Sequence, residues 1–568
     1  MKRHGIVALL LSWMLLLVWS QPNLALKGTS AVEDQRSLPT LDLSDVVIVG
    51  IEQPTRPQGK KLRELPLPPS HTISSTVVGI RDYPETASGI RLSPMMFSSN
   101  APTLLTLWAG GANHMSADAT AILHVKNDNA QGAITADWRS QNGAVDLQDR
   151  HHGEVRFSGN LRSSSSILIG IQGKLQRDSW RHYAAFDSTR KHISKKVSGD
   201  ILGEWNISAN AGLDVRIGAS EWLGENAIHN WGFRIKSPGE LDSKDINGLI
   251  GFHGRIKSIG YRAGINVDWN KTNCWGVLSE LTLAQANVGL SVPLTSRITT
   301  GATAAGAYWE RMYEDEEYRF IPEGFLAIDM SPLFGLRVQG GSTVSLMTIV
   351  DKLDLNPFMV LGHSYTESYP WIQEKPGWVK GEISRKFGES VLIRGWGGWE
   401  KIQGYPVING HQVTWSFYSD LDTVEVTKAG LGIRLQPFEQ IEMEIGGERV
   451  WGKVIQSTIF DFYGFRPRTG GVPFLEDGSA WAKVTVKPLQ DWVLDVWGTL
   501  HGEHPHWNET GNLPSYGTVG AEVRWYGLRP FMFAVWGDNL SDTRYEAFPG
   551  YEGEPFRVGV RLGFRTGS

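Results

Sequence analysis

Residues Phe556–Phe564 read FRVGVRLGF, and every second residue of this run is apolar while the residues between are arginine or glycine. Successive side chains of a β-strand point to opposite faces, so the run forms a strand with one apolar and one polar face. About nine residues is also the length that a tilted strand needs to cross a bilayer. The run therefore predicts a strand of an outer-membrane β-barrel.

The same alternation recurs along the chain in pairs of segments joined by short turns. Ala429–Gln436 alternates, turns at Pro437–Glu439 and resumes as Ile441–Gly446. Longer, polar connections separate these hairpins: Asp351–Glu374, Lys453–Asp477, His501–Tyr516 and Ser541–Pro555. Short turns on one rim and long loops on the other are typical of membrane barrels.

Composition and length are consistent with one large barrel. An unpaired backbone group costs several kcal/mol in hydrocarbon, so a membrane sheet must close on itself. About 490 residues at roughly 22 per strand and connection predict about 22 antiparallel strands, within a range of 16–24. The 55 basic and 60 acidic residues leave no basic footprint for nucleic acid. A secreted β-propeller is the main alternative fold, but no repeat of about 40–50 residues is present.

The N-terminal region differs from the rest of the chain. Residues 1–25 combine a basic start with an apolar run of about fourteen residues, which is typical of a secretory signal peptide. Residues 26–70 are rich in proline and predict an extended periplasmic arm. Residues 71–568 are expected to form the transmembrane β-barrel.

The segment Asp538–Tyr545, the Pro-Gly-Tyr at Pro549–Tyr551 and the final strand resemble the C-terminus of TonB-dependent outer-membrane receptors. This resemblance implies a Gram-negative-type outer membrane, outer-membrane lipid around the barrel, TonB or a separate periplasmic partner, and a small-molecule solute. The last strand also resembles the signal read by the barrel-assembly machinery, carried by Arg557, Gly559, Leu562 and Phe564. Two features depart from the family: residues 565–568 follow Phe564, and the globular plug that precedes the barrel in these receptors is not evident.

A short β-prone run lies inside the proline-rich arm. Its residues Asp45, Val46, Val47, Ile48 and Val49 resemble the segment that pairs with TonB, and they could add to a partner as an edge strand. The alternative is an ordinary Val/Ile run in a linker.

No catalytic motif and no cofactor-binding motif is found, so we expect a protein that is not an enzyme and has no cofactor. The tract around His501, His504 and His506 is the one candidate metal loop, with a solvated loop as its alternative. Aromatic residues near strand ends are expected to form interfacial girdles: Trp492, Trp525, Tyr526 and Trp536. Charged residues of both signs are expected to face the lumen: Arg434, Glu442, Glu444, Lys483, Lys487, Glu522, Arg524, Arg557 and Arg561.

Three functions are compatible with this sequence. The first is uptake or passage of a small solute through a lumen of mixed charge. The second is a plugless structural or binding barrel whose lumen is occluded. The third is a membrane-embedded enzyme, because a serine and a histidine brought together by folding would leave no motif.

Overall fold

The computed structural model describes residues 103–565, apart from the segments given at the end of this paragraph. Among these residues, no helix is long and apolar enough to span a membrane. The predicted signal peptide, the proline-rich arm and the run Asp45–Val49 lie outside the described residues, as do residues 71–102 of the predicted barrel. Those boundaries stay predictions. The segments left out are 114–115, 127–129, 142–149, 165, 182–190, 209, 226–240, 275–276, 312–315, 332–333, 349–369, 389, 412–415, 457–470, 474, 506–511, 529, 549–550 and 553–555.

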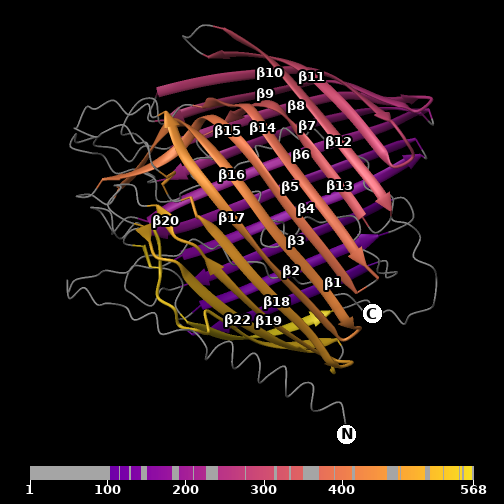
Figure 1. Cartoon of the computed structure of the whole chain (residues 1–568). Coiled ribbons are helices and arrows are strands. Elements are labelled where there is room, and N and C mark those ends of the chain that lie inside the picture. Colours follow the sequence, from indigo (N-terminus) through magenta and orange to yellow (C-terminus); the bar gives the residue numbers. More distant parts are fainter. Residues whose placement is uncertain are drawn as a thin grey trace. The chain divides into compact units, whose positions relative to one another are not determined.

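Twenty-two antiparallel strands form one closed sheet, as predicted from the sequence (Figure 1). Each strand pairs with its neighbour in the chain, and the last strand pairs with the first. The barrel strands are β1 (Thr103–Ala112), β2 (Ser116–Lys126), β3 (Ala130–Gln141), β4 (Arg150–Ser164), β5 (Ile167–Arg181), β6 (Lys191–Ser208), β7 (Ala211–Glu225), β8 (Leu241–Ile256), β9 (Ile259–Cys274), β10 (Val277–Pro293), β11 (Ile298–Arg311), β12 (Glu317–Ser331), β13 (Phe334–Met347), β14 (Trp371–Phe387), β15 (Val391–His411), β16 (Ser416–Phe438), β17 (Ile441–Gln456), β18 (Gly478–Leu489), β19 (Trp492–His501), β22 (Tyr516–Trp525), β23 (Phe531–Asp538) and β26 (Arg557–Arg565).

The seam between β1 and β26 closes the barrel. Their register runs from Thr106 opposite Arg565 to Ala112 opposite Gly559. Just beyond β1, the side-chain amide of Asn113 donates to the Phe556 carbonyl at 2.9 Å and accepts from the Val558 amide at 3.0 Å. Asn113 thus extends the ladder with its side chain and holds the start of β26 against β1.

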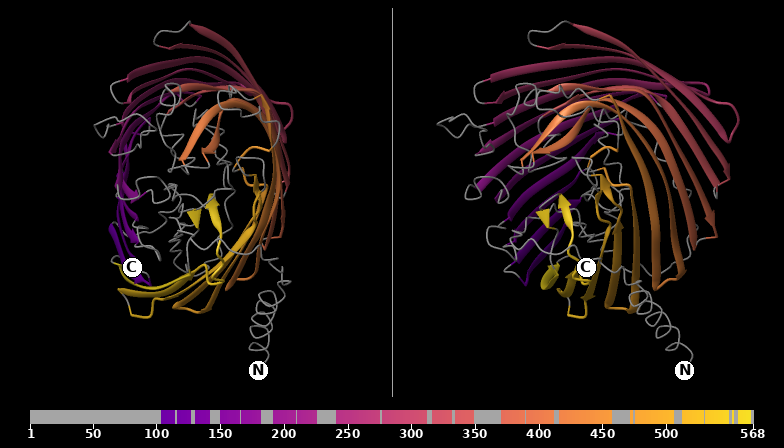
Figure 2. Two further views of the ribbon diagram at one scale, coloured as in Figure 1. Left: turned by 90° about the vertical axis from the view of Figure 1, so that its left-hand side faces the viewer. Right: turned by 60° about the vertical axis from the view of Figure 1, so that its left-hand side comes forward.

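The two rims of the barrel differ, as the connection lengths predicted. Short turns occupy 257–258 between β8 and β9 and 439–440 between β16 and β17. On the other rim, the chain runs from Met347 to Trp371 and from Gln456 to Gly478 before it re-enters the sheet. Two small sheets belong to this long-connection rim, as Figure 2 shows: β20 (His504–Pro505) pairs with β21 (Asn512–Leu513), and β24 (Glu546–Phe548) pairs with β25 (Tyr551–Glu552).

The alternation in β26 separates the two faces of the wall. Val560 is 61% exposed on the outer, lipid-facing side, whereas the Arg561 side chain is only 14% exposed on the inner side. The same division holds in β6, where Ile201 and Trp205 face outward. Because apolar side chains in water would be unfavourable over such an area, the exterior is suited to lipid.

The aromatic girdle is only partly as predicted. Trp492 and Trp525 pack together on the outer face with ring centroids 6.1 Å apart, beside the short-turn rim. Trp536 is wrong as a girdle residue, because it is buried inside the wall between Arg557 and Arg561. Tyr526 is also wrong, since it packs against the buried inward residues Trp108 and Met532. Both positions follow from alternation along the strand, because Trp536 lies on the same face of β23 as the buried Met532 and Ala534, and Tyr526 follows the outward Trp525.

Candidate functional site: the inner wall and its mouth

The inner wall carries ion pairs that link neighbouring strands. Glu154 on β4 is 4% exposed, and the Lys174 ammonium on β5 lies 2.6 Å from its carboxylate. Arg156, two residues along β4, contacts the other oxygen of the same carboxylate. A buried carboxylate needs such partners because desolvation alone would disfavour its charge. Glu154 therefore ties two strands together without leaving an excess of negative charge.

Two further carboxylates continue this pattern across β4 to β7. The Nδ1 atom of His152 lies 2.6 Å from Asp178. Asp200 accepts hydrogen bonds from the Arg216 guanidinium at 3.1 Å and from the Gln172 amide at 2.9 Å. Each contact joins side chains on adjacent strands: His152–Asp178 and Gln172–Asp200 are directly opposite in the ladder, and Asp200–Arg216 is a diagonal pair.

Around Asp245, on β7 to β9, the partners of the carboxylate are neutral donors instead of cations. Asp245 accepts from the Ser220 hydroxyl at 2.8 Å and from the Asn270 amide. The Asn270 carbonyl in turn accepts from the Thr272 hydroxyl at 2.9 Å, and that hydroxyl lies 3.2 Å from Ser243. This side of the lumen presents an anion held by hydroxyl and amide groups.

A chain of five charged residues crosses the closing region of the barrel. Arg524 on β22 is buried and contacts Asp495 on β19, and Glu522 lies 3.6 Å from the same guanidinium. Arg561 on β26 reaches Glu522 at 3.5 Å and Asp118 on β2 at 2.8 Å. The mixed signs predicted for the lumen are confirmed here, and they occur as pairs rather than as a field of one sign.

Arg561 reaches Asp118 by passing over β1. The residue of β1 that lies between them is Gly110, which is paired with Arg561 on one side and with Asp118 on the other. A Cβ at Gly110 would lie 2.5 Å from Cγ of Arg561, so a larger residue would displace the arginine stem. Glycine is thus required at position 110 because the Arg561 side chain passes close to the backbone there.

The longest hairpin, β15–β16, bends across the opening of the barrel (Figure 2). Its register shifts between Ile402 and Tyr405, and Gly404 in this bulge has a φ of +71°. The Trp371 indole donates to the Gly404 carbonyl at 2.7 Å. Such a φ favours glycine, and a bulge at this point allows the strand to turn inward.

The bent hairpin is held by an apolar cluster of its own. Ile402, Val407 and Val424 are almost fully buried, and Val472 from the β17–β18 connection packs with them. This contact joins the β15–β16 hairpin to the β17–β18 connection, so these two parts of the mouth pack against each other.

A stacked array of aromatic rings lies where β19 ends and β22 begins, at the long-connection rim. The His501 ring stacks on Tyr516 at 4.6 Å, and Tyr516 stacks on Tyr545 at 3.9 Å. His501 Nδ1 lies 3.0 Å from Glu476, whose carboxylate also accepts from the Gly502 amide at 3.0 Å. The connection after β17 is thereby fastened to the end of β19.

The candidate metal tract is divided between these elements. His501 belongs to β19 and uses Nδ1 for Glu476, while His504 belongs to the small sheet β20–β21. His506 lies outside the described residues. Within the described part of the chain, no three metal-ligating side chains come together. The metal site therefore stays a prediction that depends on His506.

His504 is half-buried, and its solvent-shielded Nε2 atom has no hydrogen-bond partner among the described residues. Burial lowers the pKa of this imidazole, although the Glu476 carboxylate acts in the opposite direction. His504 therefore favours its neutral form at this rim.

The four residues of the predicted assembly signal lie on one strand but on two faces. Arg557 faces inward, with its guanidinium 3.2 Å from Asp538, and Gly559 lies beside the Trp536 indole. Leu562 is exposed on the outer face, and Phe564 packs against Phe531 at a ring distance of 5.7 Å. Their role in assembly stays a prediction.

Sequence reasoning missed several polar groups of the inner wall. These include the buried pair Lys375–Glu400, with a 2.6 Å contact, and the network around Asp245. The sequence did contain a signal for inward-facing residues, namely charged residues at every second position of an otherwise apolar strand. It could identify inward residues but could not pair them, because the register between strands was unknown.

No protein-family model matches the sequence, and no curated protein matches it significantly. Solved structures resemble it in fold. The FrpB iron transporter from Neisseria meningitidis (F3-3 variant) has a TM-score of 0.64 at 9% identity, over 82% of this chain and 81% of that one. The ferric yersiniabactin uptake receptor FyuA from Yersinia pestis has a TM-score of 0.62 at 9% identity, over 82% and 80%. The siderophore receptor PiuA from Acinetobacter baumannii has a TM-score of 0.62 at 9% identity, over 82% of each chain.

These similarities confirm the fold expected from the resemblance to TonB-dependent receptors, a 22-stranded outer-membrane barrel. The apolar exterior and this fold together are those of a β-barrel that spans a lipid bilayer.

Proposed function

We propose that the protein takes up or passes a small polar solute as a barrel of the TonB-dependent receptor type. The observation that carries this proposal is the inner wall. Its charges are paired across strands, as in Glu154–Lys174 and Arg561–Asp118, and neutral donors surround Asp245. A wall of this kind offers hydrogen bonds to a polar solute without binding one sign of ion tightly. Ferric chelates are the first solutes to test, because FrpB, FyuA and PiuA are described as iron or siderophore proteins.

Planar-bilayer conductance of the purified protein tests whether a path exists. We expect discrete conductance steps, and we expect them to grow when residues 26–70 are deleted if the arm occupies the lumen. Silence of both the intact and the deleted protein would refute passage. It would favour the occluded binding or structural barrel, which the bent β15–β16 hairpin supports as the second candidate.

Energy coupling through TonB is tested separately in cells. Proline at Val47 and Val49 would prevent edge-strand pairing, so the double substitution should abolish uptake while the amount of folded barrel stays constant. Val32→Pro, in the same arm but outside the segment, is the matched control. Unchanged uptake in the Val47/Val49 variant would remove TonB as a partner and leave passive passage.

A non-enzymatic role is part of the proposal. Detergent-solubilised protein that hydrolysed lipid or ester substrates, with the activity abolished by one Ser→Ala substitution, would overturn it.

A further inference from the structure

The wall of the barrel splits between β12 and β13 near the long-connection rim. These strands pair over residues 323–331 of β12, which is about the length that a tilted strand needs to cross a bilayer. Nearer the rim, residues 317–322 of β12 pair only with β11, and residues 343–347 of β13 pair only with β14, among the described residues. Each strand therefore has an open edge there. The open edge of β12 begins at Pro322, which has no N–H to donate.

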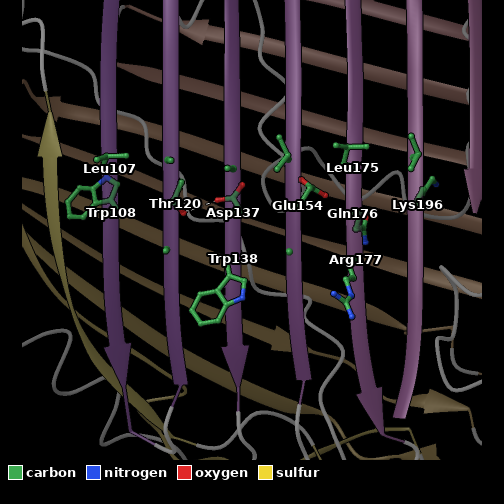
Figure 3. Close-up of a pocket in the computed structure, with 16 residues that line it drawn as sticks. Leu107, Trp108, Thr120, Asp137, Trp138, Glu154, Leu175, Gln176, Arg177 and Lys196 are labelled. Atoms are coloured by element: carbon green, nitrogen blue, oxygen red, sulfur yellow. Dashed lines mark hydrogen bonds between the residues drawn. The ribbon is translucent and has the colours of Figure 1, made fainter. Parts of the chain in front are cut away.

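The first strands of the barrel show the ordinary arrangement. The register between β2 and β3 has no shift. Thr120, Asp137 and Glu154 accordingly lie at one level on three neighbouring strands, as Figure 3 shows. The split beside β12 is a departure from this pattern. Its exposure shows the same, because Tyr318 and Phe320 are 67% and 71% exposed, more than any other large apolar side chain in the described part of the chain.

A line of β-bulges bends the wall next to the split. Four consecutive ladders shift register on the rim side of one row of the sheet, which contains Trp378 and its partners Gly341 and Glu400. The shifts lie between Gly341 and Thr343, Glu374 and Gly377, Ile402 and Tyr405, and Thr423 and Val424. A bulge bends its strand, so four of them in neighbouring ladders form a crease across β13 to β17.

On the rim side of this crease, the wall overlaps itself. The flap, defined as residues 343–347 of β13 and 371–375 of β14, contacts strands that are not its neighbours in the sheet. The Gln285 amide on β10 donates to the Val344 carbonyl at 2.8 Å, and the Arg319 guanidinium on β12 lies 3.2 Å from Glu374. The flap therefore lies against the inner side of β10 to β12.

Apolar side chains fill the space between the two layers. The wall contributes Leu281, Leu283, Ala307, Trp309 and Ile321, and the flap contributes Val344, Leu346 and Ile372. Alternation puts Val344 and Leu346 on the face of β13 that points outward at Gly340, which is opposite the 43% exposed Val379. The outer face of the flap thus packs on the inner face of the wall.

The two open edges match each other. If the β12–β13 register continued toward the rim, Phe320 would lie opposite Val344 and Tyr318 opposite Leu346. Both would be apolar pairs on the outward face. Straightening the crease would therefore extend the ladder and close the wall beside β12.

We propose that the flap is a movable lid of the lumen. In the overlapped arrangement it narrows the mouth, and when it unrolls its edge pairs with β12 and the mouth widens. Ladder hydrogen bonds and apolar pairs then replace the contacts of the overlap, which lets the two arrangements interconvert. The buried pair Lys375–Glu400 ties the flap to β15, so the bent hairpin moves with it. This inference rests on the proposed passage of a solute, for which the lid is the gate.

A disulfide that forms only after unrolling tests the movement. Every variant carries Cys274→Ser, so the introduced thiols are the only ones. Arg319→Cys and Ser345→Cys would be opposite in the extended ladder, within the Cα separation of about 4.4–6.8 Å that a disulfide spans. In the overlapped arrangement, alternation turns Ser345 away from the wall. Arg337→Cys and Glu382→Cys are opposite already and serve as the control. We expect both pairs to oxidise, as measured by mass spectrometry after thiol labelling; oxidation of the control pair alone would show that the flap does not unroll.

Planar-bilayer conductance shows whether this movement is the gate. The oxidised 319/345 protein should give larger steps than the parent, and dithiothreitol should reverse the gain. A short bis-methanethiosulfonate linker between Arg319→Cys and Glu374→Cys should hold the overlap and suppress opening. The same linker between Arg434→Cys and Glu442→Cys, on the other side of the crease, should change nothing. Conductance that ignores the 319/345 disulfide would overturn the gating role.

A substitution in the overlap shifts the balance between the two arrangements. Leu283→Ala removes a buried side chain that meets the flap only in the overlap, so it should speed oxidation of the 319/345 pair. Leu326→Ala on the outward face of β12 is the control. Equal oxidation rates in these two variants would overturn the role of the overlap. Failure of the 319/345 pair to oxidise refutes the lid and leaves passage standing, whereas silence of the trapped protein and of the protein lacking residues 26–70 refutes passage itself.

Discussion

Replacement of Arg561 by methionine tests whether the ion pair across the seam holds the barrel closed. The guanidinium lies 2.8 Å from Asp118, 3.5 Å from Glu522 and 4.5 Å from the centre of the Trp536 ring. Methionine keeps most of the stem that lies over Gly110, so the change removes charge more than packing.

The magnitude follows from burial. Removing one partner of a fully buried ion pair costs about 3–5 kcal/mol, because the other charge is left without compensation. The side chains of Arg561 and Asp118 are 14% and 18% exposed, so water reduces this cost. We expect Arg561→Met to lower the free energy of unfolding by about 2–4 kcal/mol.

Arg434 supplies a matched control on the same inner face. Its guanidinium contacts Glu442, but the two side chains are 57% and 35% exposed. An exposed pair of this kind contributes only about 0–1 kcal/mol, so Arg434→Met should have a small effect. Urea unfolding of the barrel refolded in lipid vesicles, followed by tryptophan fluorescence, measures both.

A double-mutant cycle isolates the pair itself. If Arg561 and Asp118 interact as the structure shows, Asp118→Asn should destabilise the parent more than it destabilises the Arg561→Met variant, by at least about 1 kcal/mol. The reasoning is refuted if Arg561→Met costs no more than Arg434→Met, or if the two seam substitutions are additive.

Two other parts of the mouth give predictions. Gly404→Ala should lower stability by about 1–3 kcal/mol, because φ is +71° and a Cβ would lie 2.8 Å from the Ile372 carbonyl oxygen; Gly306→Ala, where a Cβ meets nothing within 4 Å, should be close to neutral in the same unfolding assay. Burial lowers the pKa of His504 in the folded state, so the unfolded chain binds protons more readily as pH falls below about 6.5 and stability decreases. Comparing the parent with His504→Gln at pH 7.5 and pH 5.5 should show a smaller loss in the variant, and an equal loss would contradict this assignment.

The sequence alone determined which face of each strand meets lipid. Side chains alternate with a period of two, so the apolar set of Phe556–Phe564 had to lie on one side and Arg557 and Arg561 on the other. The difference between the rims also followed from the chain, because turn residues and connection lengths are local properties. For the same reason the strand number could be estimated from length.

Only the tertiary structure decided which residues meet across the wall. Arg561 and Asp118 are 443 positions apart, and their contact requires that β26 close onto β1 in one register. Trp536 was misplaced for a different reason: its location near a strand end was weighed above the alternation of β23, which buries it together with Met532 and Ala534. Alternation is a property of consecutive residues and can be recognised in the sequence. Register is a relation between residues that are distant in the chain, so only the folded structure shows it.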